Sequence, residues 1–263
     1  MVIQAIRYAL HDSDETFDAI LRPVIVDMLT TMLRDADLEN RRLALTTLNA
    51  ATSNKPALIL PQLSKLLQYV VQNTEIDQSL IREVQMGPFK HKVDDGLEIR
   101  KVLPESMLFV SVTDTTQSAY ETLRTLVNNA WSRLNPLLVF DRVVAGLKDE
   151  KDIKKFCNLM LTRLIELDAD EATRRLDEIA AAYTATLSIK LKDNAVKQEL
   201  EKQQEANKDV LRTTIILRDT FPHASNPSLT STQHGVWKAY TDYVNKNFNR
   251  EIGAAEEELR TQR

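Results

Sequence analysis

The fold is decided by the stretch Leu147-Lys148-Asp149-Glu150-Lys151-Asp152-Ile153-Lys154-Lys155, an acidic turn followed by a basic pair. Apolar side chains precede it over residues 137–147 and follow it over residues 156–167, in both cases at i, i+3, i+4 spacing. This spacing places the apolar side chains of each segment on one face of a helix. The stretch therefore predicts two amphipathic helices joined by a short turn.

The same order of apolar stripe, acidic turn and basic pair occurs twice more in the chain. It is found at Leu33-Arg34-Asp35-Ala36-Asp37-Leu38-Glu39-Asn40-Arg41-Arg42 and at Val93-Asp94-Asp95-Gly96-Leu97-Glu98-Ile99-Arg100-Lys101. In each copy a turn aspartate can cap the second helix, and the basic residues can pair with a neighbouring unit. Three such copies are typical of HEAT repeats, so we expect an all-α HEAT-repeat α-solenoid.

The separation of the three copies indicates two insertions. The basic pairs begin at residues 41, 100 and 154, so they lie 59 and 54 residues apart. A two-helix HEAT unit takes about 40 residues. Each interval therefore carries additional residues, and the two insertions differ in kind.

The first insertion, residues 81–93, reads as a β-hairpin because Gly87-Pro88 would break a helix in its middle. Glycine followed by proline fits the two central positions of a type II′ turn, where the glycine takes a positive φ. The predicted register pairs Met86 with Phe89, Gln85 with Lys90, Val84 with His91, Glu83 with Lys92 and Arg82 with Val93.

This register makes the hairpin amphipathic, because alternate side chains of a strand point to opposite faces. A two-stranded hairpin alone is marginal in water, so its apolar face must lie on the solenoid or on a partner. For Val84 and Val93 at the base both alternatives stay open, whereas at Met86 and Phe89 we expect a partner. The apolar face holds Val84, Met86, Phe89, His91 and Val93, and the polar face holds Glu83, Gln85, Lys90 and Lys92.

The second insertion, residues 102–117, interrupts what would otherwise be one helix. Without it the last two basic pairs lie 38 residues apart, which is an ordinary HEAT length. We hypothesise a short retained intron; a genuine loop insertion is the alternative, and transcript sequencing across Lys101 and Ser118 distinguishes them. Removing the insertion aligns Ala44 with Ala119 and Cys157, and Leu48 with Leu123 and Leu161.

The composition excludes several classes of protein. Glycine supplies 5 and proline 8 of 263 residues, too few for a sandwich, a barrel or a glycine-rich phosphate loop. The net charge of −4 argues against a general nucleic-acid or anionic-membrane binder. The single cysteine, Cys157, excludes an internal disulfide and a cysteine-based zinc site and indicates a reducing compartment. No catalytic motif occurs, so we expect no enzyme activity, metal or cofactor.

The run from Leu80 to Lys101 closely resembles the C-terminal region of the cullin-associated, neddylation-dissociated (Cand) family, first described as a TATA-binding-protein-interacting protein. Gly146–Asp149 and Asn194–Glu199 are similar to it as well, and the resemblance runs from about residue 15 to residue 220. It implies a long HEAT solenoid of which this chain holds the last few repeats. We therefore expect repeats over residues 1–222 and a helical cap or tail over 223–263, whose charged end frays.

The resemblance also implies a function. Family members wrap around unneddylated cullin–RING (SCF) ubiquitin ligase scaffolds and promote exchange of substrate receptors, and their hairpin occupies the adaptor-docking surface of the cullin N-terminal domain. The implied partners are a cullin, in competition with the adaptor, and a separate N-terminal half of the same family, with no direct nucleic acid or membrane. The implied contact residues are Val84, Gln85, Met86, Gly87, Pro88, Phe89, Lys90, His91 and Lys92.

A second function stays open at this point. The chain could be a generic HEAT scaffold acting in transcription, through the TATA-binding protein, or in transport. That alternative predicts binding on the concave face of the repeats, without the hairpin. For either function we expect a location in the nucleus and the cytoplasm.

Overall fold

The computed structural model describes residues 2–12, 15–87, 89–101, 118–191, 196–221 and 230–261, with the backbone alone at Val2, Gln4, Asp12, Glu15 and Met86. The chain forms two compact units, Met1–Val139 and Phe140–Arg263, each with its own helical core. Helices make up almost all the regular structure described, and the strands form one two-stranded antiparallel sheet. The predicted all-α HEAT-like solenoid with one β-hairpin is therefore confirmed.

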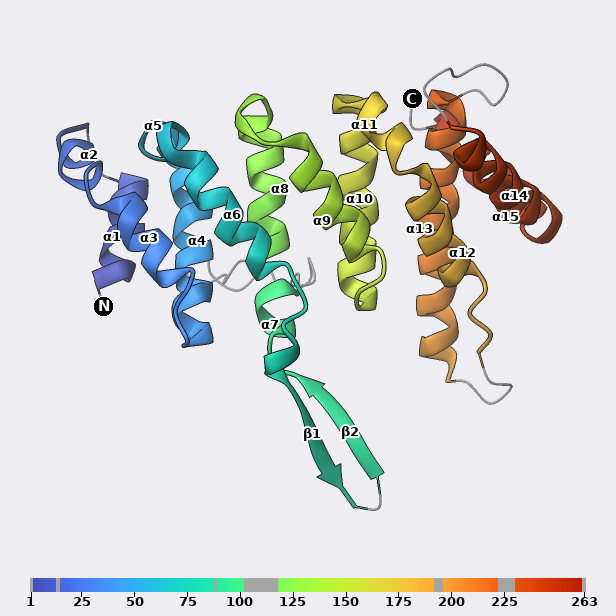
Figure 1. The fold of residues 1–263 in the computed structure, drawn as a ribbon, viewed down its shortest axis with the longest axis horizontal. Helices are drawn as coiled ribbons and strands as arrows, with labels where there is room; N and C mark the ends of the chain where they lie inside the picture. The colour runs from blue at the N-terminus through green and yellow to red at the C-terminus, as the bar shows by residue number, and fades with distance from the viewer. Residues whose placement is uncertain are drawn as a thin grey trace. The chain divides into compact units, whose positions relative to one another are not determined.

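Unit 1 is built around α4, which packs against α1, α3 and α8, while α6 packs against α3 and α8 (Figure 1). The second helices of neighbouring pairs thus lie side by side, as repeat stacking requires. The elements of unit 1 are α1 (Val2–Asp12), α2 (Glu15–Leu21), α3 (Ile25–Met32), α4 (Leu38–Asn54), α5 (Pro56–Ile59), η1 (Leu60–Gln62), α6 (Leu63–Asn73), η2 (Gln78–Leu80), β1 (Ile81–Met86), β2 (Phe89–Asp94), α7 (Leu97–Arg100), α8 (Ala119–Ala130) and η4 (Trp131–Arg133).

Unit 2 repeats this arrangement, with α13 packed between α10 and α15, and with α12 packed on both α13 and α14. Its helix α9 begins in the last residues of unit 1. The elements are α9 (Pro136–Gly146), α10 (Lys151–Leu167), α11 (Ala169–Arg174), α12 (Leu176–Leu187), α13 (Lys197–Thr220), α14 (Ser231–Asn247) and α15 (Asn249–Thr261).

The turn aspartates cap a following helix in only one of the three sequence copies. Asp37 is the N-cap of α4, and its side chain accepts a hydrogen bond from the backbone N–H of Glu39 at 2.9 Å. Asp94 and Asp149 lie before the cap instead, and accept from the N–H groups of Gly96 and Glu150. In all three copies an aspartate of the acidic turn therefore accepts a hydrogen bond from a backbone N–H at the start of the following helix. In the first copy the aspartate is the N-cap residue, and in the other two it precedes the N-cap.

The residues aligned across the second insertion share one feature, which is burial in the helical core. Residues 102–117 themselves lie outside the described residues, so the retained-intron hypothesis stays a prediction. The flanking helices α7 and α8 contact each other and both pack on α4, as two parts of one second helix would. The aligned residues Ala44, Ala119, Cys157, Leu48, Leu123 and Leu161 are all fully buried.

The charged end is helical and packed as far as it is described, to Thr261, so the prediction that it frays was wrong for these residues. Ile252 and Ala255 are buried, and Glu258 forms ion pairs with Lys208 (2.9 Å) and Arg212 on α13. The charged residues of α15 thus find complementary charges on the neighbouring helix, which sequence alone did not place beside them. The boundary expected between residues 222 and 223 lies outside the described residues and stays a prediction.

Candidate functional site

The β-hairpin has the predicted register. β1 pairs antiparallel with β2, with Met86 opposite Phe89 and Arg82 opposite Val93. Gly87 has a φ of +61°, the left-handed value that favours glycine at this position. Pro88 lies outside the described residues, so the type of turn stays a prediction.

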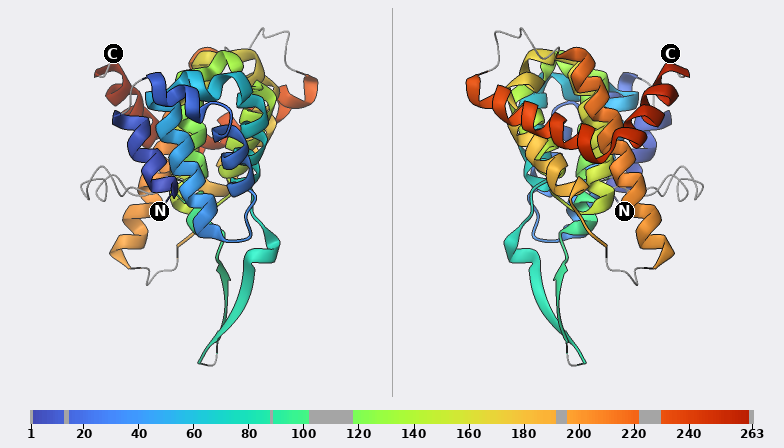
Figure 2. Two further views of the ribbon diagram at one scale, coloured as in Figure 1. Left: turned by 90° about the vertical axis from the view of Figure 1, so that its left-hand side faces the viewer. Right: turned by 90° about the vertical axis from the view of Figure 1, so that its right-hand side faces the viewer.

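The hairpin projects away from the helices of unit 1 in all three views (Figures 1 and 2). Phe89, next to the turn, is 67% exposed, and Val84 and Val93 near the base are half-buried. Among the described helices none covers Phe89, and a large exposed aromatic side chain on a protruding element is typical of a contact with another molecule. The other described residues of the predicted site, Gln85, Gly87, Lys90, His91 and Lys92, are all exposed.

The hairpin charges leave one cation available. Glu83 lies opposite Lys92, but its ion pair is diagonal, to Lys90 Nζ at 3.5 Å. The right-handed twist of a two-stranded ribbon brings some diagonal side chains closer than direct neighbours. Among the described residues, Lys92 has no carboxylate partner. The tip of the hairpin, defined here as residues 86–92, therefore combines an exposed aromatic ring with exposed positive charge.

The root of the hairpin, defined here as Leu80, Arg82, Asp94, Asp95, Gly96 and Arg100, is built differently. Arg100 on α7 is 1% exposed, and its Nη2 donates to Asp94 Oδ2 at 2.7 Å. Asp94 Oδ1 also accepts from the Gly96 N–H at 2.9 Å. A Cβ on Gly96 would lie 3.0 Å from Leu80 Cδ1, a tight contact that the leucine side chain would have to relieve by moving.

A second ion pair joins the two strands at the root. Arg82 Nε and Nη2 donate to the two carboxylate oxygens of Asp95 at 2.6 and 3.1 Å. This hydrogen bonding lowers the pKa of Asp95 and raises that of Arg82. The Asp95 N–H donates in turn to the Leu80 carbonyl at 3.1 Å. Two successive aspartates at the end of β2 thus fix the hairpin both to its own first strand and to α7.

The role of Arg100 was not predicted from the sequence. The repeat pattern placed this residue in a basic pair facing a neighbouring repeat, whereas its side chain is buried against its own hairpin. Within the described ranges, no three His, Cys, Asp or Glu side chains gather where a metal ion could bind, and no helix is long and apolar enough to cross a membrane. What the arrangement can do chemically is present an apolar, basic tip on a fixed support.

Comparisons with known proteins identify the family. Residues 58–245 match the family model described as "TATA-binding protein interacting (TIP20)". The chain is 46% identical over 259 residues to "Cullin-associated NEDD8-dissociated protein 1, C-terminal part" of Emericella nidulans, covering 98% of this chain and 23% of that relative. It is 37% identical to "Cullin-associated NEDD8-dissociated protein 1" of Drosophila melanogaster and 36% identical to "Cullin-associated NEDD8-dissociated protein 2" of Mus musculus.

Each of these last two matches covers 82% of this chain and 16% of the relative, so the chain spans less than a quarter of the length of these relatives. The similarity also extends past residue 220, further than the sequence motifs predicted. The chain belongs to the cullin-associated, NEDD8-dissociated family, and it corresponds to part of the much longer relatives.

Proposed function

We propose that this chain is a non-catalytic interaction module that associates with a cullin through the tip of its hairpin. The names of its relatives support the class of partner. The observation that carries the proposal is Phe89, which is exposed on a protruding hairpin whose root is fixed by two ion pairs. A preformed hairpin loses little conformational entropy on binding, so little of the binding free energy from the tip contacts is offset by ordering the hairpin.

The tip offers three kinds of contact. Burial of the Phe89 ring against a partner contributes about 1.5–3 kcal/mol. Lys92 adds an available positive charge at the edge of that contact, where it affects association rate more than affinity. The outer edges of β1 and β2 also leave backbone groups that a partner strand could pair with.

The finer mechanism that we propose is competition. The tip occupies the adaptor-docking surface of the cullin N-terminal domain, so the adaptor and this chain exclude one another, and the substrate receptor of a cullin–RING (SCF) ligase can be exchanged. Binding is to the unneddylated cullin and takes place in the nucleus and the cytoplasm. A separate N-terminal half of the same family supplies the remaining contacts, because this chain spans only 23% of its Emericella relative.

The first test is capture of a purified cullin N-terminal domain by the immobilised chain. Phe89→Asp should reduce capture at least tenfold, because it places a charge in the apolar contact. The matched control is Leu159→Asp on α10, which replaces a side chain that is 57% exposed and belongs to unit 2 rather than to the hairpin. Equal capture by wild type and Phe89→Asp, with unchanged helical circular dichroism, would refute the hairpin contact.

A second measurement addresses the competition itself. Excess adaptor should release the captured cullin in proportion to adaptor occupancy, and a NEDD8-modified cullin should be captured poorly. If adaptor and this chain bind the same cullin molecule together, the exchange mechanism is wrong even though cullin binding stands.

The description of the matching family favours one alternative function, a scaffold that binds the TATA-binding protein. On this alternative, immobilised TATA-binding protein should capture the chain, and Phe89→Asp should have no effect because the helical repeats make the contact. The scaffold function is excluded if cullin capture depends on the hairpin and the chain captures neither TATA-binding protein nor a transport cargo.

A further inference from the structure

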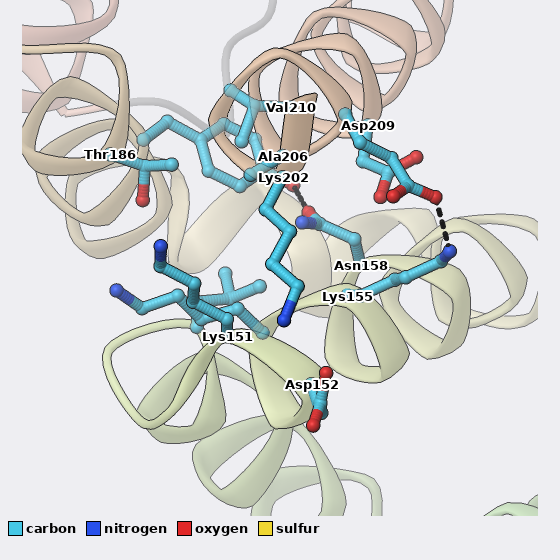
Figure 3. A pocket seen from close by; sticks show the side chains of 13 residues that line it. Lys151, Asp152, Lys155, Asn158, Thr186, Lys202, Ala206, Asp209 and Val210 are labelled. Carbon is cyan, nitrogen blue, oxygen red and sulfur yellow. Dashed lines mark hydrogen bonds and ion pairs between the residues drawn. The ribbon is translucent and has the colours of Figure 1, made fainter. Parts of the chain in front are cut away.

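A second candidate site lies in unit 2 and shares no residue with the hairpin. Helices α10, α12 and α13 enclose a pocket of 130 Å³ (Figure 3). At about 30 Å³ per water molecule, this volume corresponds to about four waters. That is the scale of a compact group of five heavy atoms. Polar side chains line much of the pocket, so it is suited to a polar ligand.

The pocket contains a side-chain hydrogen-bond donor that finds no acceptor in the described part of the chain. Asn158 on α10 is only 6% exposed, and its Oδ1 accepts from the Tyr183 hydroxyl at 2.6 Å. Within the described part of the chain, its Nδ2 donates to no acceptor, and Figure 3 shows the amide in the middle of the pocket. A ligand oxygen beside Nδ2 would accept this hydrogen bond in place of solvent.

Positive charge gathers around this donor. Lys151 and Lys154 on α10 and Lys202 on α13 line the pocket, and among the described residues none of the three pairs with a carboxylate. The N-cap of α10, Glu150, makes no side-chain hydrogen bond to the first turn of this 17-residue helix. The positive end of the helix dipole and its N–H groups thus add to the charge of the lysines.

The acidic residues of the pocket lie mostly on one side of it. Lys155 Nζ donates to Glu205 Oε1 at 2.5 Å, which offsets the charge of that carboxylate. In Figure 3, Asp209 lies on the same side as Lys155, and Lys151 lies on the other, with Asn158 between them. Burial raises the pKa of Asp209. Asp152 is the remaining carboxylate in the lining.

We propose that this pocket binds a tetrahedral oxyanion, either free phosphate or a phosphoryl group carried by a partner peptide. Asn158 Nδ2 and the ammonium groups of Lys151, Lys154 and Lys202 are the donors. Such a group fits the volume of the pocket. Its negative charge would pair with the three lysines, which have no carboxylate partner among the described residues. The site is independent of the hairpin, so phosphate binding and cullin capture can fail separately.

The test is calorimetric titration of the full chain with inorganic phosphate and, separately, with a phosphoserine peptide and its unphosphorylated form. Saturable binding of inorganic phosphate, or of the phosphorylated peptide alone, is the expected result. Tighter binding of the phosphoserine peptide than of inorganic phosphate assigns the group to a partner, and the reverse assigns free phosphate. No saturable binding of either probe overturns the proposal.

Variants show whether binding occurs in this pocket. The double variant Lys151→Ala, Lys202→Ala should weaken binding about tenfold, since each lysine contributes one partly exposed charged contact. Asn158→Asp should weaken it further, because it keeps the acceptor for Tyr183 but replaces the donor by a negative charge. Lys238→Ala with Lys246→Ala on α14 removes the same charge elsewhere and should have little effect. Equal weakening by both lysine pairs, or none by either, contradicts the assignment.

Discussion

The tip and the root of the hairpin lie within the same stretch of sequence, residues 80–100, but are stabilised by different interactions. At the tip Phe89 and Lys92 are exposed, and the two strands pair with each other. At the root Arg100 is 1% exposed and holds Asp94, while Gly96 lies against Leu80. The tip can therefore change without disturbing the helices, whereas the root cannot.

This difference assigns partner recognition to the tip and stability to the root. Substitutions at the tip should alter partner binding and leave the unfolding free energy almost unchanged, because surface changes cost little. Substitutions at the root should lower the unfolding free energy of unit 1 first and partner binding second. The four predictions below test this separation.

The largest effect is expected for Asp94→Ala at the root. It leaves the buried Arg100 without that carboxylate, and breaking a buried ion pair in this way costs about 3 kcal/mol or more. Urea unfolding followed by circular dichroism measures the change. The control is Glu83→Ala, which removes an exposed carboxylate from the hairpin. If both variants unfold at the same urea concentration, the buried ion pair at the root stabilises unit 1 no more than the exposed ion pair of Glu83 does.

Gly96→Ala should come next, lowering the unfolding free energy by about 1–3 kcal/mol through overpacking. The new Cβ would lie 3.0 Å from Leu80 Cδ1 and 3.2 Å from Asp94 Oδ1. The additional variant Leu80→Ala makes room for this Cβ, so the combined change should be less than the sum of the two. If the changes in unfolding free energy of Gly96→Ala and Leu80→Ala simply add, the contact between the new Cβ and Leu80 is not the cause of the destabilisation.

Gly87→Ala at the tip should have a smaller and strictly local effect. The φ of +61° costs a non-glycine residue about 1–2 kcal/mol. Nothing lies within 4 Å of the added Cβ, so no clash is added. Hydrogen exchange should speed up at the β1 and β2 amides, while exchange in α4 and α8 stays unchanged. Faster exchange in the helices would show that tip and core are coupled.

The smallest effect is expected from pH, at Asp95. The hydrogen bond from Arg82 lowers the pKa of this carboxyl below the ordinary value of 3.8. A lowered folded-state pKa means that the contribution is present above the unfolded-state pKa and is lost as pH falls through the folded-state value. Hydrogen exchange at the hairpin base should therefore speed up in that acidic window, and Asp95→Asn should remove the pH dependence. A pH response that persists in Asp95→Asn would assign it to another carboxyl.

Much of the fold followed from local patterns. Spacing of apolar residues predicted the helices, and the alternation around Gly87 predicted the register of the hairpin. Both depend on residues near one another in the sequence, where geometry is fixed by the period of the helix or strand. Even across the interruption at 102–117, matching core positions could be assigned, because Ala119 and Leu123 keep the spacing of Ala44 and Leu48.

The candidate sites were predicted less evenly. The exposed tip followed from an amphipathic hairpin too small to bury its own apolar face. The role of Arg100 did not, because a basic residue next to Lys101 reads as part of a surface pair. The pocket at Asn158 was also missed, since it joins α10, α12 and α13 across about fifty residues of sequence.

The sequence by itself determined the class of fold, the hairpin and the family, because each depends on local periodicity or on motif residues that occur together. The tertiary structure decided which charges are buried and which remain available. Burial depends on which helix packs against which, and that choice makes Arg100 a structural ion-pair partner while leaving Lys92 and Lys151 exposed to a ligand or partner.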